Sequence, residues 1–243
     1  VPTADCEGGE MAAIAYYERV EKQSDYLYPD VIVIDPRITR YATSLEIANC
    51  ALTSLAHAIE ACGIDAPNPI NDAFAHSALQ FIYQYLPKTM KKPNHKDGTV
   101  ALVNAAACAD TAFSNAPQGI VHTLAHAIAL DTNLKPGIIM GVLLRYSLAV
   151  KLHSKSGIRP ELLLALAGID TYAKTPEKDR QKIAYDYLIQ CIDATRKYVP
   201  TTLKGFYIPR YKLKEFAKLA ATKNKQYKET DYMALLEKSF EGK

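Results

Sequence analysis

Long apolar runs, a leader-like start and paired cysteines are all missing from this sequence. No apolar run approaches the roughly 20 residues that a membrane-spanning helix needs. The opening Val1-Pro2-Thr3 has no basic stretch followed by an apolar one. The five cysteines form no C-x-x-C pair, and their odd number argues against a disulfide framework. These absences predict a cytoplasmic protein without a membrane partner. Because the first residue is Val rather than Met, we also expect that an upstream part is missing.

A strong charge of one sign and the common catalytic motifs are missing as well. The net charge is only +3 and is spread along the chain, so no nucleic-acid or membrane partner is expected. The sequence contains neither a P-loop nor a G-x-S-x-G segment, which excludes the common phosphotransfer and hydrolase classes. It also contains no G-x-G-x-x-G turn of the kind that holds a pyrophosphate.

What is present is enough apolar material for a sizeable core, because 49% of the 243 residues are hydrophobic. Residues 11–17 and 31–34 are β-rich or small and apolar, and a charged stretch at 18–25 separates them, so we predict a strand pair. From about Thr39 the apolar residues follow a helical period. The sequence therefore predicts a mainly α fold, a helical bundle at 39–243 that follows a short β segment at 1–38.

Individual helices can be placed from caps and breakers. Thr43 or Ser44 can cap a helix that runs to Cys62 and stops at Gly63. Asn71 or Asp72 is expected to cap a second helix that ends before Pro87. Further helices are predicted at about 100–114, 118–130, 137–152, 160–167, 178–198, 212–222 and 230–240.

Two histidines four residues apart form the most informative motif. Residues 113–126 read FSNAPQGIVHTLAH, and the helical spacing puts His122 and His126 on one face. An earlier segment, residues 55–60, reads LAHAIE and contains His57. Together with PTADCEGGE at 2–10 and NPINDA at 68–73, these segments resemble the iron-dependent (group III) alcohol dehydrogenases over nearly the whole chain.

The resemblance implies a helical domain that binds iron or zinc through one Asp and three His. His57 and His122 match two of these metal positions, whereas the Asp position is Thr53 and the third His position is Pro136. A Pro nitrogen has no lone pair, and a neutral Thr hydroxyl is a poor ligand beside a carboxylate. The resemblance assigns His126 to substrate or proton handling. We therefore expect a degenerate metal site, with His57 and His122 as its remaining ligands and His126 as a proton relay.

The same resemblance implies an NAD(P)-binding loop at the N-terminus. Thr3 and Gly8 match that loop, but Asp5 and Glu7 would place carboxylates beside an anionic cofactor. The family's glycine-rich pyrophosphate turn lies upstream of this loop and is absent here. Residues 1–38 are therefore interpreted as the remnant of a nucleotide-binding half, and this chain alone is expected to bind NAD(P) weakly or not at all.

Two functions from different classes stay open. The first is an oxidoreductase domain that acts on a small alcohol or aldehyde, with His57 and His122 on an ion and His126 relaying the proton. The second is a non-catalytic assembly or regulatory subunit, which could form a homo-oligomer, in which His57 and His122 are buried, hydrogen-bonded residues. Thr53 and Pro136 favour the second on chemical grounds, whereas the family resemblance favours the first.

Overall fold

A computed structural model of the 243-residue chain describes residues 2, 11, 14–17, 20–39, 41–63, 68–93, 95–155 and 157–242. The fold is mainly α, as the sequence predicts, and the part of residues 40–243 that is described contains no strand. In the described ranges, no helix is both long and apolar enough to cross a membrane. The division into 1–38 and 39–243, and the origin of the first part as a remnant, stay predictions.

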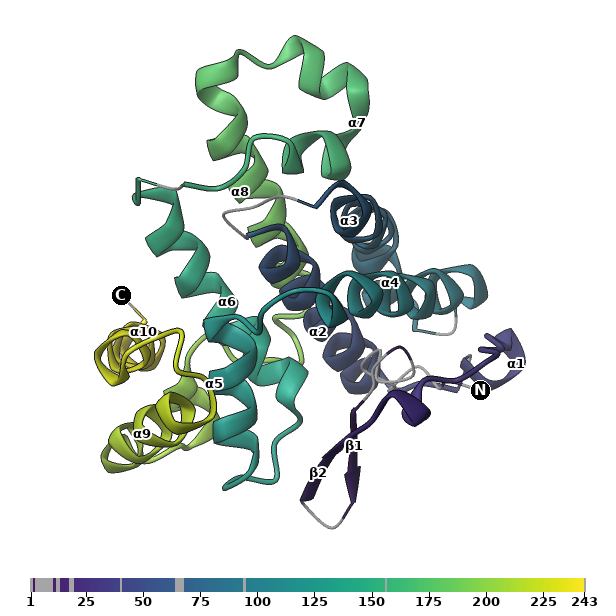
Figure 1. Cartoon of the computed structure of the whole chain (residues 1–243). Coiled ribbons are helices and arrows are strands. Elements are labelled where there is room, and N and C mark those ends of the chain that lie inside the picture. The colour runs from purple at the N-terminus through teal and green to yellow at the C-terminus, as the bar shows by residue number, and fades with distance from the viewer. Residues whose placement is uncertain are drawn as a thin grey trace.

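A short antiparallel hairpin precedes the helices. β1 (Ile14–Tyr17) pairs with β2 (Val20–Gln23) in a register that sets Ile14 against Gln23. The predicted first strand is therefore present, but the prediction of a second strand at 31–34 is wrong, because those residues have no regular structure. The partner is instead found in the charged stretch, where a close hairpin costs less loop-closure entropy than a distant pairing. Figure 1 shows the hairpin projecting from the helical body.

The central helix, α2 (Ser44–Cys62), begins where its sequence predicts. Thr43 and Glu46 form a capping box: the Glu46 backbone N–H donates to Thr43 Oγ1 at 3.2 Å, and the Thr43 N–H donates to Glu46 Oε2 at 2.7 Å. The helix ends at Gly63, also as predicted. Nearly every residue from Ile47 to Cys62 is buried, so α2 is the core of the bundle rather than a surface helix.

The second long helix, α3 (Pro69–Lys91), differs from its prediction at both ends. Its N-cap is Asn68, whose side chain accepts from the Ile70 N–H at 3.0 Å, and not Asn71 or Asp72. Pro69 suits the first helical position because its missing N–H would be unpaired there anyway. The helix also continues through Pro87, because the residues beyond it include the buried Met90 and pack into the core.

The remaining helices agree with the predicted segments to within a few residues, except at three ends. The structure adds the short helix α1. It starts α4 at Lys96 rather than at 100, and it carries α7 past Gly168 rather than ending it at 167. It also ends α8 at Asp193, five residues before the predicted end at 198. The helices other than α2 and α3 are α1 (Pro36–Thr39), α4 (Lys96–Ser114), α5 (Ile120–Ala129), α6 (Pro136–Leu152), α7 (Leu162–Lys174), α8 (Glu177–Asp193), α9 (Leu213–Lys223) and α10 (Glu229–Glu241).

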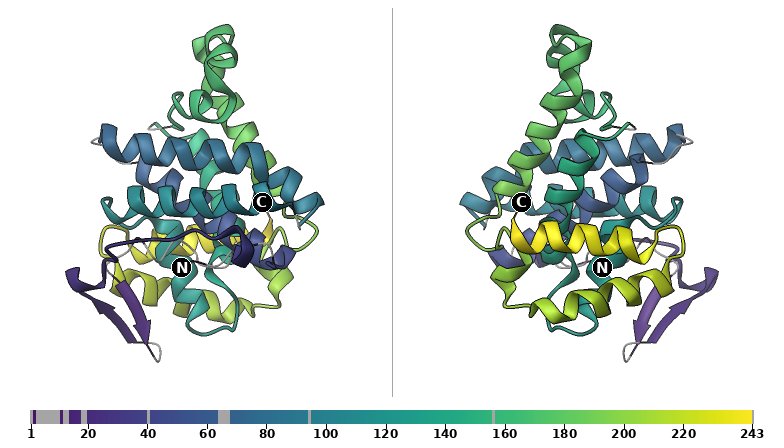
Figure 2. Two further views of the ribbon diagram at one scale, coloured as in Figure 1. Left: turned by 90° about the vertical axis from the view of Figure 1, so that its right-hand side faces the viewer. Right: turned by 90° about the vertical axis from the view of Figure 1, so that its left-hand side faces the viewer.

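The helices surround α2 in two groups. α3 and α4 pack on α2 and on each other, and α6 packs on α2 from a different side. α5 joins α6, and α9 and α10 form a further pair against α5 and α6 (Figure 1). α7 and the start of α8 project from the end of this body, as both views in Figure 2 show. The arrangement brings α2, α4 and α5 together, and these three helices supply the candidate site.

Candidate active site

His57 lies at the centre of the candidate site, on the buried helix α2. The residue is 6% exposed, and its two ring nitrogens face different partners. His57 Nδ1 is 2.7 Å from Asp110 Oδ1 on α4, and His57 Nε2 is 2.9 Å from His122 Nδ1 on α5. The ring also stacks on Phe113, with centroids 4.1 Å apart and an interplanar angle of 2°. The imidazole is therefore fixed in position by neighbours from two other helices, α4 and α5.

These distances define a direction for the hydrogen bonds. A carboxylate only accepts, so the nitrogen of His57 that faces ionised Asp110 carries a hydrogen. In a neutral His57 the opposite nitrogen, Nε2, then accepts, and Nδ1 of His122 is the donor to it. Burial raises the pKa of Asp110 above its ordinary value, while the hydrogen bond from His57 and the charge of His57 oppose that rise. The three side chains form one buried hydrogen-bonded chain, Asp110–His57–His122.

The second imidazole is held by a carboxylate from α2. Glu60 Oε1 accepts from the Val121 N–H at 2.7 Å, and Oε2 accepts from the His122 N–H at 3.3 Å. The N-cap of α5 is Gly119, which offers no side chain, so Glu60 does the capping from another helix. Burial raises the pKa of Glu60, against the lowering effect of these two hydrogen bonds and of nearby His57 and Lys151.

The capping carboxylate occupies the space that a side chain would take at Gly119. A Cβ built on Gly119 would lie 2.0 Å from Glu60 Cδ and 2.1 Å from Oε1. The backbone at Gly119 is ordinary extended chain, so glycine is needed here for space and not for its conformation. The Pro-Gln-Gly turn that precedes the histidine motif thus has a physical role, which is to admit Glu60.

His126 completes a row of three imidazoles. His122 and His126 have ring centroids 4.3 Å apart, and those of His57 and His122 are 5.0 Å apart. Burial lowers the pKa of His126 to about 4, helped by the charges of His57 and Lys223. Burial also holds the pKa of His122 well below its ordinary value. Both rings are therefore neutral near pH 7. The structure thus brings together the three histidines that the sequence singled out, although their roles stay predictions.

Thr53 and Pro136, the positions where the family resemblance implies two further ligands, lie where α6 begins against α2. Thr53 is buried on α2, and its Oγ1 has no hydrogen-bond partner within the described residues. Pro136 is the first residue of α6. The next residue, Gly137, packs so closely on α2 that a Cβ there would lie 2.3 Å from Thr53 Oγ1. The start of α6 therefore packs on α2 at Thr53, and the two positions present a neutral hydroxyl and a proline ring.

Asp110 does not replace the lost carboxylate ligand. It faces Nδ1 of His57, whereas His122 faces Nε2, and the two nitrogens lie on opposite edges of the ring. An ion bound between His57 and His122 would be out of reach of Asp110, which could only orient the ring. Across the ranges that are described, no group of three or more His, Cys, Asp or Glu side chains is arranged to hold a metal ion.

Sequence reasoning found the histidines but missed their carboxylate partners. The LAHAIE segment contains Glu60 but assigns it no role, and no motif in the sequence includes Asp110. A usable signal existed for Asp110, since it is the only charged residue in the small and apolar run at 100–113. The predicted cofactor-binding residues Thr3 and Gly8 lie outside the described residues, as do Asp5 and Glu7.

Known proteins support this assignment of the helices and motifs. A sequence profile described as the Fe-containing alcohol dehydrogenase family, C-terminal, matches residues 47–239. The chain is 25% identical over its full length to a long-chain-alcohol dehydrogenase of Geobacillus thermodenitrificans, 63% of which it covers. Over 60% of its length it is 30% identical to a 1-propanol dehydrogenase of Citrobacter freundii, 41% of which is covered.

Solved structures agree on the fold. A 1,3-propanediol oxidoreductase superposes on 96% of the chain with a TM-score of 0.81 at 20% identity, and 63% of that protein is covered. Maleylacetate reductase from Agrobacterium tumefaciens superposes on 97% with a TM-score of 0.76 at 20% identity, and 65% of it is covered. The chain thus spans less than two thirds of these relatives. Since the family profile covers most of the chain, the chain belongs to the iron-containing alcohol dehydrogenase family, whose C-terminal domain it contains.

Proposed function

We propose that this chain is a metal-free member of its family, a helical domain that binds neither iron nor zinc tightly and does not oxidise alcohols with NAD(P) by itself. The observation that carries the proposal is the state of His57. Both of its ring nitrogens have protein partners, Asp110 at 2.7 Å and His122 at 2.9 Å. The imidazole that would be the first metal ligand is thus a member of a closed hydrogen-bonded chain.

The ligand count supports the same conclusion. A catalytic metal site has at least three protein ligands and one open position. Only His57 and His122 remain here, because Thr53 and Pro136 supply neither charge nor a nitrogen lone pair. Losing one outer-shell partner of a metal ligand typically lowers affinity by about 10- to 100-fold. Losing two direct ligands should lower affinity further.

A non-catalytic role as an assembly or regulatory subunit follows from this chemistry. The helices and the core are retained while the ligands are lost, so what remains for function is the helical surface. Assembly with a second copy of the chain is one form that such a role can take. The absence of C-x-x-C pairs, and the lack of a disulfide at Cys62, Cys108 and Cys191 among the described residues, support a cytoplasmic location.

The competing proposal is an oxidoreductase acting on a small alcohol or aldehyde. One observation favours it: His126 is neutral near pH 7 because burial lowers its pKa to about 4, and a neutral imidazole can accept a proton from an alcohol. The relatives named above are alcohol dehydrogenases of greater length. In this proposal a separate part would supply the nicotinamide.

Elemental analysis separates the two proposals. The purified chain is dialysed anaerobically against excess Fe²⁺ or Zn²⁺, washed with a chelator and analysed for metal, and ethanol and propanediol oxidation are assayed with NAD⁺ and NADP⁺. We expect less than one tenth of an equivalent of metal and no turnover above background. Stoichiometric metal after the wash, or turnover, would overturn the proposal.

Restoring the ligands provides the positive control. The double variant Thr53→Asp/Pro136→His should retain close to one equivalent of metal, whereas each single variant should retain much less. Circular dichroism at 222 nm verifies that the variants keep their helices, since a buried carboxylate introduced at position 53 is destabilising without metal. We expect the double variant to bind metal without gaining alcohol oxidation.

A further inference from the structure

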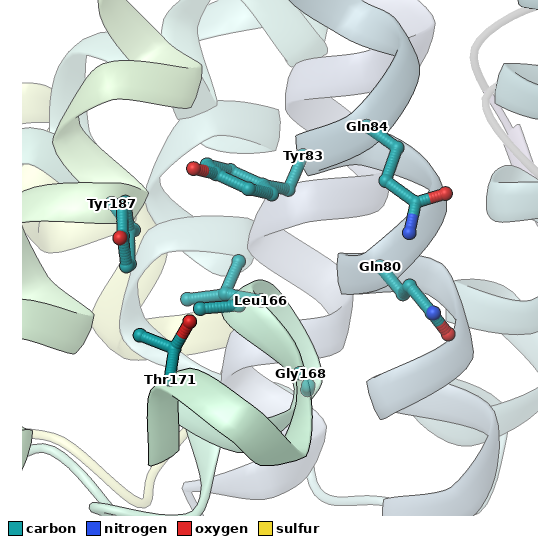
Figure 3. Close-up of a pocket in the computed structure, with 9 residues that line it drawn as sticks. Gln80, Tyr83, Gln84, Leu166, Gly168, Thr171 and Tyr187 are labelled. Atoms are coloured by element: carbon teal, nitrogen blue, oxygen red, sulfur yellow. The ribbon is translucent and has the colours of Figure 1, made fainter. Parts of the chain in front are cut away.

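A cavity lies where α7 and α8 meet α3. Its volume is about 240 Å³. It shares no helix with the Asp110–His57–His122 chain, which comes from α2, α4 and α5. Figure 3 shows Gln80, Tyr83 and Gln84 on one side, with Leu166, Gly168, Thr171 and Tyr187 facing them.

The polar groups of this cavity are available to a ligand. Within the described residues, the carboxamides of Gln80 and Gln84, which are exposed at the rim, and the half-buried hydroxyl of Thr171 make no hydrogen bond to the protein. Each carboxamide offers two donors and an acceptor, and the Thr171 hydroxyl can donate or accept. Helical threonines commonly donate to the carbonyl four residues earlier. That option is interrupted for Thr171, since the helix breaks at Gly168.

The break at Gly168 keeps one side of the cavity open. Gly168 has φ 79° and ψ 173°, a left-handed conformation in the middle of α7 that side chains rarely adopt. A Cβ added there would meet nothing within 4 Å. The chain bends at this residue instead of covering the cavity with a continuous helix. Glycine thereby places the first and second halves of α7 around an accessible space.

Aromatic and aliphatic groups give the cavity an apolar wall. Tyr83 and Tyr187 make an edge-to-face contact with ring centroids 5.0 Å apart, and Figure 3 shows Tyr83 pointing toward Tyr187. Leu166 is buried beneath them. No Lys, Arg, Asp, Glu or His is among the described residues that line the cavity. An ionised ligand would therefore find no partner of opposite charge among these lining residues.

From this lining we infer that the cavity between α3, α7 and α8 binds a small, uncharged, polyhydroxylated molecule of the polyol or monosaccharide class. Adjacent hydroxyls of such a molecule match the donors and acceptors of Gln80 and Gln84, and its C–H face packs on the tyrosine rings and Leu166. The cavity is smaller than the roughly 300–1,000 Å³ of sites for drug-sized ligands, so the ligand is small. The inference does not depend on the state of the histidine cluster.

Ligand binding is tested by NMR on the ¹⁵N-labelled full chain. The probes are glycerol, myo-inositol and glucose, with gluconate and glucosamine as charged probes of similar size. At least one neutral probe should saturate and shift the amide signals of Gln80, Gln84, Gly168 and Thr171. The charged probes should bind at least tenfold more weakly.

Matched variants decide whether the cavity itself is responsible. Gln80→Leu/Gln84→Leu should weaken binding of the neutral probe at least tenfold, whereas Gln190→Leu, on the exposed surface of α8 outside the cavity, should leave it unchanged. Thr171→Val removes only the hydroxyl and should weaken binding severalfold. Three outcomes would each overturn the inference: no neutral probe saturates, shifts arise elsewhere in the chain, or the double variant binds as tightly as the natural sequence.

Discussion

Replacing Gly119 by alanine tests whether Glu60 holds the helix that carries His122 and His126. The new methyl group would overlap the Glu60 carboxyl group, whose Cδ lies 2.0 Å from the Cβ position. The backbone at Gly119, with φ −82° and ψ 175°, accepts alanine without strain. The only consequence is therefore that Glu60 must leave the N–H groups of Val121 and His122, or that α5 must shift away from it.

The size of the effect follows from the contacts that are lost. Losing an N-cap interaction costs about 0.5–2 kcal/mol, and leaving a buried acceptor without its donors costs about 1–3 kcal/mol. Alanine also lowers the conformational entropy of the unfolded chain, which offsets about 0.4–1 kcal/mol of the lost stability. We therefore expect Gly119→Ala to lower the free energy of unfolding by about 2–3 kcal/mol, as measured by urea unfolding followed at 222 nm.

A double-mutant cycle isolates the contact with Glu60. In a Glu60→Ala background the carboxylate is gone, so Gly119→Ala should be neutral or slightly stabilising. Gly168→Ala is the control for a glycine with free space but a positive φ, and it should cost about 1–3 kcal/mol from backbone strain alone. If Gly119→Ala costs the same with and without Glu60, or costs under about 0.5 kcal/mol, the capping argument is wrong.

Three further changes are expected to have measurable effects. His126 has a pKa of about 4 in the folded chain against 6.5 in its unperturbed state, so the stability it contributes is present above pH 6.5 and falls as the pH drops toward 4. Unfolding free energies at pH 7 and pH 5 should differ by up to about 2 kcal/mol more in the natural chain than in His126→Gln. Arg159 donates to both carboxylate oxygens of Asp72 at 2.8 Å, so Arg159→Lys, which loses the paired geometry, should cost about 1–2 kcal/mol in urea unfolding; no change would contradict this. Thr43→Ala removes half of the capping box of α2 and should cost about 1 kcal/mol, whereas Thr43→Ser should cost much less.

Local chemistry explains why several elements could be predicted from the sequence. The start of α2 is specified by Thr43 and Glu46, which lie three residues apart and bond to each other. The helix predicted at 160–167 ends next to the break at Gly168 in α7, although α7 resumes beyond that break. The continuation of α3 through Pro87 could not be predicted, because a local cost of about 3 kcal/mol is outweighed by tertiary packing of the residues that follow.

The geometry of the site depended on contacts between distant residues. His57 and Asp110 are 53 positions apart, and His57 and His122 are 65 apart, so no local pattern connects them. The family resemblance brought the three histidines together but could not say which ring nitrogen faces which neighbour. That detail decides whether Asp110 competes with a metal ion or only orients the ring. The residues at the two other expected ligand positions, Thr53 and Pro136, can in contrast be read directly from the sequence.

The most direct test of the central claim is an anomalous diffraction measurement at the zinc edge on crystals of the natural chain soaked in excess Zn²⁺. We predict no anomalous peak between His57 and His122, with His57 Nε2 still at hydrogen-bond distance from His122 Nδ1 and His57 Nδ1 still on Asp110. A peak about 2.1 Å from a nitrogen of each histidine would contradict the account, because it would show that two imidazoles are sufficient to hold the ion.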